Sequence, residues 1–239
     1  MRADGYGSRL IAFVLAPYLF PQSRVVLSHL PQLDEAQGKW KGLVPGRDPL
    51  RLLVYGDSTV AGVGVDDQRD GLARHLGLEL AAHTGRGVRW KAIARSGATT
   101  GELRRYFLPR AERGRYDVVF LSLGVNDVMH LRHTRRFTRD LEVTIARLRA
   151  SSPDAVIVVA GVPRMERFRS LPDPLGTILG ARARRMNVRA RAVVDRHPGV
   201  VHVPPWPIGT PGFFARDDFH PSAAGYAAWA KQAVDYWMR

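Results

Sequence analysis

Residues 51–64 read Arg-Leu-Leu-Val-Tyr-Gly-Asp-Ser-Thr-Val-Ala-Gly-Val-Gly, and this stretch decides the fold. Residues 52–55 form a short apolar run that ends at Gly56, a pattern typical of a strand buried on both faces of a parallel sheet. Ser58 follows where that strand should end, just before a helical pattern, and open α/β sheets bind ligands at this edge. Ser58 is therefore a candidate nucleophile, although Gly-Asp-Ser is also common turn chemistry.

Strand-like and helix-like segments alternate from Arg51 onward, which is typical of a parallel α/β sheet. Further strands are expected at residues 88–94, 117–123, 155–160 and 200–203. Helices are expected at residues 67–83, from Thr99 or Thr100 to about 108, at 137–148, at 177–196 and at the C-terminus. The sequence thus predicts one α/β domain over residues 51–239, with five parallel strands.

The composition of the 239-residue chain is that of a soluble globular protein, with 45% hydrophobic and 24% charged residues. The net charge of +14 comes almost entirely from arginine, because only four lysines are present. Such a field attracts anionic surfaces, but the arginines are spread along the chain without interleaved aromatic residues, so we expect solvated helix faces and no nucleic-acid partner. The lack of cysteine excludes disulfides, a thiol nucleophile and a thiolate metal site.

Residues 1–50 are expected to lie outside this domain. The apolar residues 10–20 are too few to span a bilayer, which needs about 20, and no small-x-small cleavage site follows them. Two interpretations stay open: an interfacial anchor that binds anionic membranes weakly through residues 9–24, or a helix packed on the protein's own surface. We expect a cytoplasmic or membrane-associated protein, with secretion left open. Residues 31–50, rich in Gly and Pro, are predicted to be an irregular connector.

A serine nucleophile needs a base, which is usually a histidine oriented by a carboxylate. Among eight histidines, His220 is distinguished by the segment Asp217-Asp-Phe-His-Pro-Ser222, which places an acid three residues before it. Residues three apart return to the same side of a turn, so Asp217 is favoured over Asp218 as its partner. The alternative is an acidic loop that caps the next helix.

Acyl transfer also needs hydrogen-bond donors for the developing oxyanion. Gly97 can offer an unhindered backbone N–H, and Asn126 can offer a side-chain amide. Both follow predicted strands. They should therefore meet Ser58 at the same edge of the sheet.

These blocks, in their order and spacing, resemble the SGNH hydrolase family, also called the GDSL esterases and lipases: Gly56-Asp-Ser58, Gly97, Gly124-x-Asn126-Asp and Asp217-x-x-His220. The resemblance covers most of residues 51–238 and implies a flavodoxin-like three-layer α/β/α sandwich. It implies Ser58 as nucleophile, His220 as base and Asp217 as its partner. It also implies an oxyanion hole made by the Ser58 and Gly97 amides and the Asn126 side chain.

Two positions depart from the family pattern. Thr59 replaces the Leu of the family's name, and the block around Gly97 lacks the Asn often found a few residues before its glycine.

The expected activity is hydrolysis of small-molecule carboxylic esters or thioesters, of short to medium acyl chain, through an acyl-enzyme and without cofactor or metal. A carbohydrate O-acetyl esterase is an alternative, as is a non-catalytic protein that binds anionic lipid or polymer on a hydrolase fold. Trp206, Phe213 and Phe214 could line an acyl pocket or pack an irregular loop. His130 and His133 could ligate a metal, but with no clear third ligand nearby an ordinary polar loop is favoured.

Overall fold

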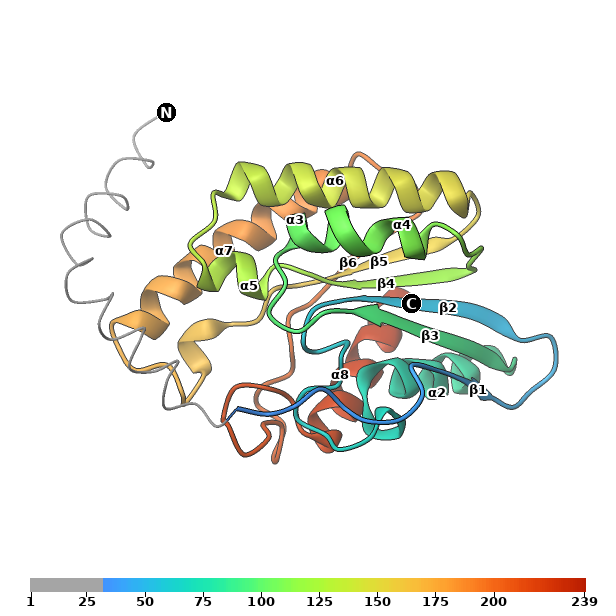
Figure 1. Cartoon of the computed structure of the whole chain (residues 1–239), viewed down its shortest axis with the longest axis horizontal. Coiled ribbons are helices and arrows are strands. Elements are labelled where there is room, and N and C mark those ends of the chain that lie inside the picture. Colours follow the sequence, from blue (N-terminus) through green and yellow to red (C-terminus); the bar gives the residue numbers. More distant parts are fainter. Residues whose placement is uncertain (1–31) are drawn as a thin grey trace.

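The computed structural model describes residues 32–239 (Figure 1). The hypothesis of a membrane anchor concerns residues 9–24 and so lies outside the described residues. Within residues 32–239, none of the helices combines the length and the apolar character needed to cross a bilayer.

A sheet of six strands forms the centre of the molecule, in the order β1-β3-β2-β4-β5-β6. The five parallel strands lie where the sequence predicts them: β2 (Leu50–Gly56), β3 (Val88–Ala94), β4 (Val118–Ser122), β5 (Val156–Ala160) and β6 (Val200–Val203). The predicted count of five is wrong by one, because β1 (Lys41–Val44) pairs antiparallel with β3 at the sheet edge.

Strand β1 also corrects the prediction that residues 31–50 are irregular throughout. A Cβ on Gly42 would lie 2.6 Å from the Trp90 ring, so the glycine lets the backbone of β1 press against that ring. The strand has four residues, of which every second one is half-buried and the others are exposed. Its sequence therefore lacks the apolar alternation by which strands are predicted.

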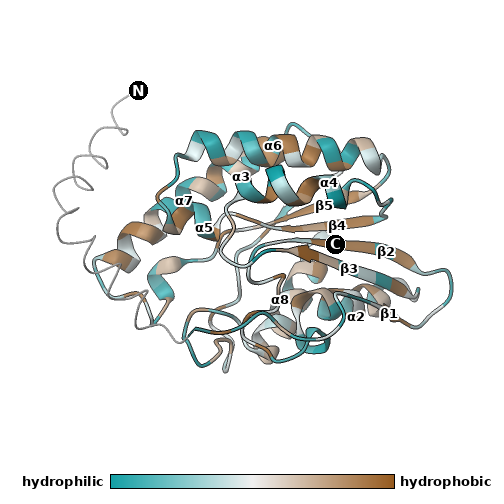
Figure 2. Ribbon diagram, viewed as in Figure 1, coloured by the Kyte–Doolittle hydropathy of each residue, from teal (hydrophilic) through white to brown (hydrophobic). Residues whose placement is uncertain are grey.

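Helices cover both faces of the sheet, which gives three layers (Figure 1). One face carries α2 (Leu72–Thr84) and α8 (Ala223–Trp237). The other carries α6 (Thr134–Ser151), α7 (Leu175–Val194) and the shorter helices α3 (Thr100–Glu102), α4 (Leu108–Ala111) and α5 (Val125–Met129). Hydrophobic residues concentrate on the strands, and polar residues on the outer faces of the helices (Figure 2).

Burial follows the sequence pattern closely. All four residues of the run 52–55 are fully buried, as expected for a strand covered on both faces. The helical stripe predicted in α6 is buried as well, at Phe137, Leu141, Ile145 and Leu148. This core fixes the carboxyl ends of β2, β3 and β4 side by side.

An extended segment, residues 33–37, crosses the side of the molecule where these strands end; we call it the strap. The Ala36 N–H donates to the Ala61 carbonyl oxygen at 3.0 Å, and the Gln37 N–H donates to that of Asp66 at 2.9 Å. Ala36 is buried. The strap is therefore attached to the segment that follows Ser58, rather than being a free linker.

Candidate active site

Strand β2 ends in a tight turn that presents Ser58. A Cβ on Gly56 would lie 2.2 Å from the Ser122 carbonyl oxygen, so only glycine allows β2 and β4 to approach this closely. The Asp57 carbonyl then accepts hydrogen bonds from the N–H groups of Val60 and Ala61, which begins a helical turn at the serine. We call residues 57–63 the nucleophile turn.

The side chains of Asp57 and Thr59 hold this turn in place through hydrogen bonds. Asp57 Oδ1 accepts hydrogen bonds from the Thr59 N–H at 3.2 Å and from its hydroxyl at 3.0 Å, and Thr59 Oγ1 lies 2.8 Å from Ser122 Oγ. Burial, opposed by the hydrogen bonds from Thr59, raises the pKa of Asp57 to about 6. Thr59, the departure from the family's Leu, thus ties the turn to β4.

The structure brings Ser58, His220 and Asp217 together. Ser58 Oγ lies 3.0 Å from His220 Nε2, and His220 Nδ1 lies 2.6 Å from Asp217 Oδ2. Asp217 is only 4% exposed, and its Oδ1 accepts the backbone N–H groups of Phe219 and His220 at 3.0 and 2.9 Å. Burial acts to raise the pKa of Asp217, but the hydrogen bonds from His220 outweigh it and hold that pKa below its usual value.

Asp218, the neighbouring acid, has a different environment. Its backbone adopts a left-handed conformation with φ of 51°, and its carbonyl accepts a hydrogen bond from the Ser170 hydroxyl at 2.9 Å. The imidazole contact is made by Asp217 instead, as the spacing of three residues predicts.

Gly97 and Asn126 lie at the ends of the two strands that flank β2. Gly97 has φ of +74° in a turn closed by the Ala98 N–H and the Arg95 carbonyl, and we call residues 95–98 the oxyanion turn. Asn126 lies in α5, and its Nδ2 donates to the Ala98 carbonyl at 3.1 Å. Asn126 is therefore bonded to the turn that carries Gly97, through the neighbouring residue Ala98.

Two further polar residues at this edge of the sheet were not predicted from the sequence. Asp127 is fully buried, and its Oδ2 accepts both the N–H and the hydroxyl of Thr100, which joins α5 to the start of α3. Glu35, in the strap, accepts the Ser96 N–H at 2.9 Å through Oε1. Asp127 stands next to Asn126 and could have been noticed there. Glu35 is 61 residues away from its partner, and no local pattern marks it.

The aromatic residues of the loop after β6 pack against one another. Trp206 and Phe213 are 5% and 2% exposed, with ring centroids 5.9 Å apart, and Trp206 also stacks on Phe168. Phe214 is half-buried at the edge of this cluster, 5.2 Å from Phe168. Trp206 and Phe213 therefore pack the irregular loop, which is one of the two interpretations of these residues; the other is that they line an acyl pocket.

His130 and His133 make local contacts at the end of α5 and the start of α6. His130 Nδ1 lies 2.8 Å from the Asn126 carbonyl oxygen, and His133 Nδ1 accepts the Arg135 N–H at 3.2 Å. Across residues 32–239, no group of three or more His, Asp or Glu side chains is placed to hold a metal ion.

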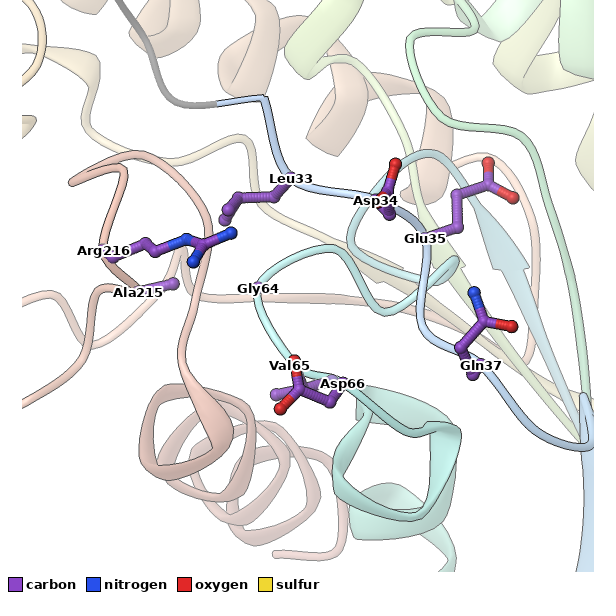
Figure 3. A pocket seen from close by; sticks show the side chains of 9 residues that line it. All are labelled: Leu33, Asp34, Glu35, Gln37, Gly64, Val65, Asp66, Ala215 and Arg216. Atoms are coloured by element: carbon purple, nitrogen blue, oxygen red, sulfur yellow. The ribbon is translucent and has the colours of Figure 1, made fainter.

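A pocket of about 430 Å³ lies between the strap, residues 64–66 and residues 215–216 (Figure 3). The Ala215 N–H donates to the His220 carbonyl, and the Cβ position of Gly64 lies 3.3 Å from His220 Cβ. Leu33 of the strap and Arg216 reach toward each other across the pocket. Its wall is mixed, with five polar or charged residues among the nine that line it: Leu33, Asp34, Glu35, Gln37, Gly64, Val65, Asp66, Ala215 and Arg216.

Residues 54–228, well over half of the chain, match a family model described as the GDSL-like lipase/acylhydrolase family. The chain belongs to this family. The resemblance inferred from the four sequence blocks is thereby confirmed. A curated member, the GDSL-like esterase Rv1075c of Mycobacterium tuberculosis, is 28% identical over 200 residues, which cover 79% of this chain and 61% of the relative. The chain thus spans about three-fifths of that relative's length.

Solved structures share the fold of this GDSL-family chain at low sequence identity. The esterase EstA from Pseudoalteromonas sp. matches with a TM-score of 0.60 at 16% identity, over 79% of this chain and 98% of EstA. A family two carbohydrate esterase from Clostridium thermocellum, solved with cellohexaose, matches with a TM-score of 0.58 at 19% identity, over 82% of this chain and 66% of its own.

Proposed function

We propose that this GDSL-family protein is a serine hydrolase that cleaves carboxylic esters or thioesters through an acyl-enzyme. One observation carries the proposal: Ser58 Oγ, the His220 ring and the buried Asp217 form a continuous line of contacts of 3.0 and 2.6 Å. Hydrogen-bond reach between a hydroxyl and an imidazole, with a carboxylate behind the imidazole, is the arrangement that activates a serine.

The chemistry follows from which atom holds each proton. Asp217 accepts the Nδ1 proton of His220, which leaves Nε2 free to take the proton of Ser58 as Oγ attacks the ester carbonyl. His220 then gives that proton to the departing alcohol or thiol, and the acyl group stays on Oγ. In the second half, Nε2 takes a proton from water, the resulting hydroxide attacks the acyl carbonyl, and Ser58 recovers its proton as the acid leaves.

The oxyanion that forms in both halves would be held by the N–H groups of Ser58 and Gly97 and by Asn126 Nδ2. One hydrogen of the Asn126 amide is already donated to the Ala98 carbonyl, and this bond orients the group. The second hydrogen is left to donate to the oxyanion. Donors that are fixed before the reaction lower the barrier, because they need no reorganisation when charge develops.

Labelling with a fluorophosphonate tests the proposal against a non-catalytic binding protein. We expect one covalent adduct on Ser58, found by mass spectrometry of the tryptic peptide, and no adduct in Ser58→Ala. A folded wild-type protein that neither takes up the label nor hydrolyses p-nitrophenyl acetate would reject the hydrolase function.

For the acyl group we propose short to medium chains. Hydrolysis of p-nitrophenyl esters of increasing chain length tests this, and kcat/KM should fall for long chains. A preference for chains of twelve or more carbons would contradict it.

A carbohydrate O-acetyl esterase is the second candidate, and the carboxylates and the Arg216 guanidinium that line the pocket favour it. Carboxylates and a guanidinium can bind sugar hydroxyls, whereas a lipid alcohol would need an apolar wall.

Asp34 is exposed, so Asp34→Trp should block the pocket without disturbing the core. We expect this variant to lose activity on a mono-acetylated methyl pyranoside but to keep its activity on methyl acetate. Asp154→Trp, in the loop before β5 at the opposite end of the sheet, is the matched control. Equal losses of activity on the two substrates would reject the carbohydrate O-acetyl esterase but not the hydrolase function.

A further inference from the structure

The two backbone donors proposed for the oxyanion belong to different turns. The Ser58 N–H lies in the nucleophile turn after β2, and the Gly97 N–H lies in the oxyanion turn after β3. Both must point at one oxygen, so the distance between the two turns has to be held closely. A displacement of about 1 Å at such a site can cost about 100-fold in rate.

The oxyanion turn has little packing of its own. Arg95, Ser96 and Gly97 are all exposed, and no atom lies within 4 Å of the position that a Cβ on Gly97 would take. Besides the bond from Asn126 Nδ2 to the Ala98 carbonyl, two backbone hydrogen bonds involve the turn: the Arg95 N–H donates to the Gly56 carbonyl of β2, and the Ala98 N–H donates to the Arg95 carbonyl within the turn. Both are 3.3 Å long, near the weak end of the range for such bonds.

Glu35 adds a shorter and charge-assisted bond to the same turn, from the Ser96 N–H to Oε1 at 2.9 Å. The Ser96 N–H belongs to the peptide unit just before the one that carries the Gly97 N–H, so this bond restrains the oxyanion turn one peptide unit away from the proposed donor. Hydrogen bonds to an ionised acceptor are roughly twice as strong as neutral ones.

Glu35 is itself held in place by the nucleophile turn. Its neighbour Ala36 is buried and donates to the Ala61 carbonyl at 3.0 Å. Gly62 has φ of +76°, and a Cβ there would lie 2.6 Å from the Ala36 Cβ, so the strap and the nucleophile turn are in close contact. The strap therefore bridges the two turns: its backbone is bonded to one and its Glu35 carboxylate to the other.

We propose that Glu35 is a positioning residue for the oxyanion hole, which fixes the Gly97 N–H relative to the Ser58 N–H. The inference rests on the proposed hydrolase function. It assigns a role in the reaction to a residue outside the region 54–228 that the family model matches.

Three variants of Glu35 separate a hydrogen-bond role from a role of charge or bulk. Glu35→Ala removes the acceptor, and Glu35→Asp keeps the charge but shortens the reach to Ser96. We expect both to lower kcat for p-nitrophenyl acetate about 10- to 100-fold, with KM within about twofold of wild type. Glu35→Gln keeps an oxygen that can accept the Ser96 N–H, and it should stay within about threefold. Lys39→Ala, at an exposed position two residues beyond the strap and outside the pocket, is the control and should match wild type.

The rate of Ser58 phosphonylation by a fluorophosphonate gives an independent readout, because its adduct places an oxygen where the oxyanion forms. It should fall in parallel with kcat in the Ala and Asp variants, while thermal unfolding shows that all four proteins are folded. Wild-type kinetics in Glu35→Ala, a loss in Glu35→Gln equal to that in Glu35→Ala, or a rise in KM alone would each overturn the inference. If Glu35→Ala does not fold, the contrast between the Asp and Gln variants decides the question. An inactive, unlabelled wild type would instead reject the hydrolase function itself.

Discussion

Replacing Asp217 by Asn should reverse the tautomer of His220. Oδ1 of Asp217 accepts two backbone N–H groups, from Phe219 and His220, and an amide NH₂ cannot take that place without opposing two donors. The Asn oxygen must therefore occupy the Oδ1 position, which turns its NH₂ toward His220 Nδ1. Nδ1 then becomes an acceptor, the proton moves to Nε2, and Nε2 can no longer accept the proton of Ser58.

The expected loss in kcat is about 10⁴-fold at neutral pH, the size that tautomer reversal causes in serine hydrolases, which corresponds to about 5.5 kcal/mol of transition-state stabilisation. KM should change little, because the substrate does not touch this carboxylate in the proposed mechanism. Steady-state kinetics with p-nitrophenyl acetate give both values.

Asp218→Asn is the matched control and should stay within a few-fold of wild type, since Asn tolerates the left-handed backbone of that position. If Asp218→Asn were the more damaged enzyme, or if Asp217→Asn kept a tenth of wild-type kcat, the role assigned to Asp217 would be wrong.

Three further predictions follow from other parts of the molecule. Asn126→Ala should lower kcat about 10²–10³-fold with little change in KM, measured with the same ester; a large rise in KM alone would indicate ground-state binding instead. The pKa of Asp57 is about 6 in the folded protein and near 3.8 otherwise, so the folded state holds this proton more tightly and stability should fall as the pH rises from about 4 through 6. Asp57→Asn removes the free-energy cost of ionising this buried carboxyl. In urea unfolding the variant should be more stable than wild type at pH 8, by at most about 3 kcal/mol, and no more stable at pH 4. A gain in stability that is independent of pH would contradict the assignment. Deletion of residues 1–30 keeps the strap and should leave ester hydrolysis intact while reducing binding to anionic vesicles in a sedimentation assay; unchanged vesicle binding would exclude the anchor, and a truncated chain that does not fold would show that the segment belongs to the core.

The parts of the fold that could be predicted are those where local chemistry and tertiary structure agree. The run 52–55 is apolar at every position because both faces of β2 are covered, so the strand was evident from sequence. Thr99 was expected to cap a helix, and it forms a capping box with Glu102. The single helix expected after it is interrupted by a π-helical turn at Leu103–Phe107, which the hydrophobic pattern does not reveal.

The site was predictable for a related reason. Ser58, Gly97 and Asn126 each lie two to four residues after a strand, His220 lies three residues before a helix, and the parallel sheet brings the strand ends to one edge. Glu35 lies neither just after a strand nor just before a helix. Its partner is a backbone N–H, which every residue but proline possesses, so nothing in the sequence identifies the pair.

Strand β1 has a consequence for how molecules of this protein aggregate. A chain without residues 41–44 would leave β3, which is seven residues long, at the edge of the sheet, with the backbone N–H and C=O groups that now pair with β1 left unpaired. An open edge of that length is a template on which a second molecule can add a strand and begin to aggregate. In the intact domain that edge is occupied by four residues that include Lys41, and a short, charged strand is a much poorer template. The residues before the matched region 54–228 thus protect the sheet from intermolecular pairing, and shortened versions made for crystallisation or engineering should begin upstream of the strap.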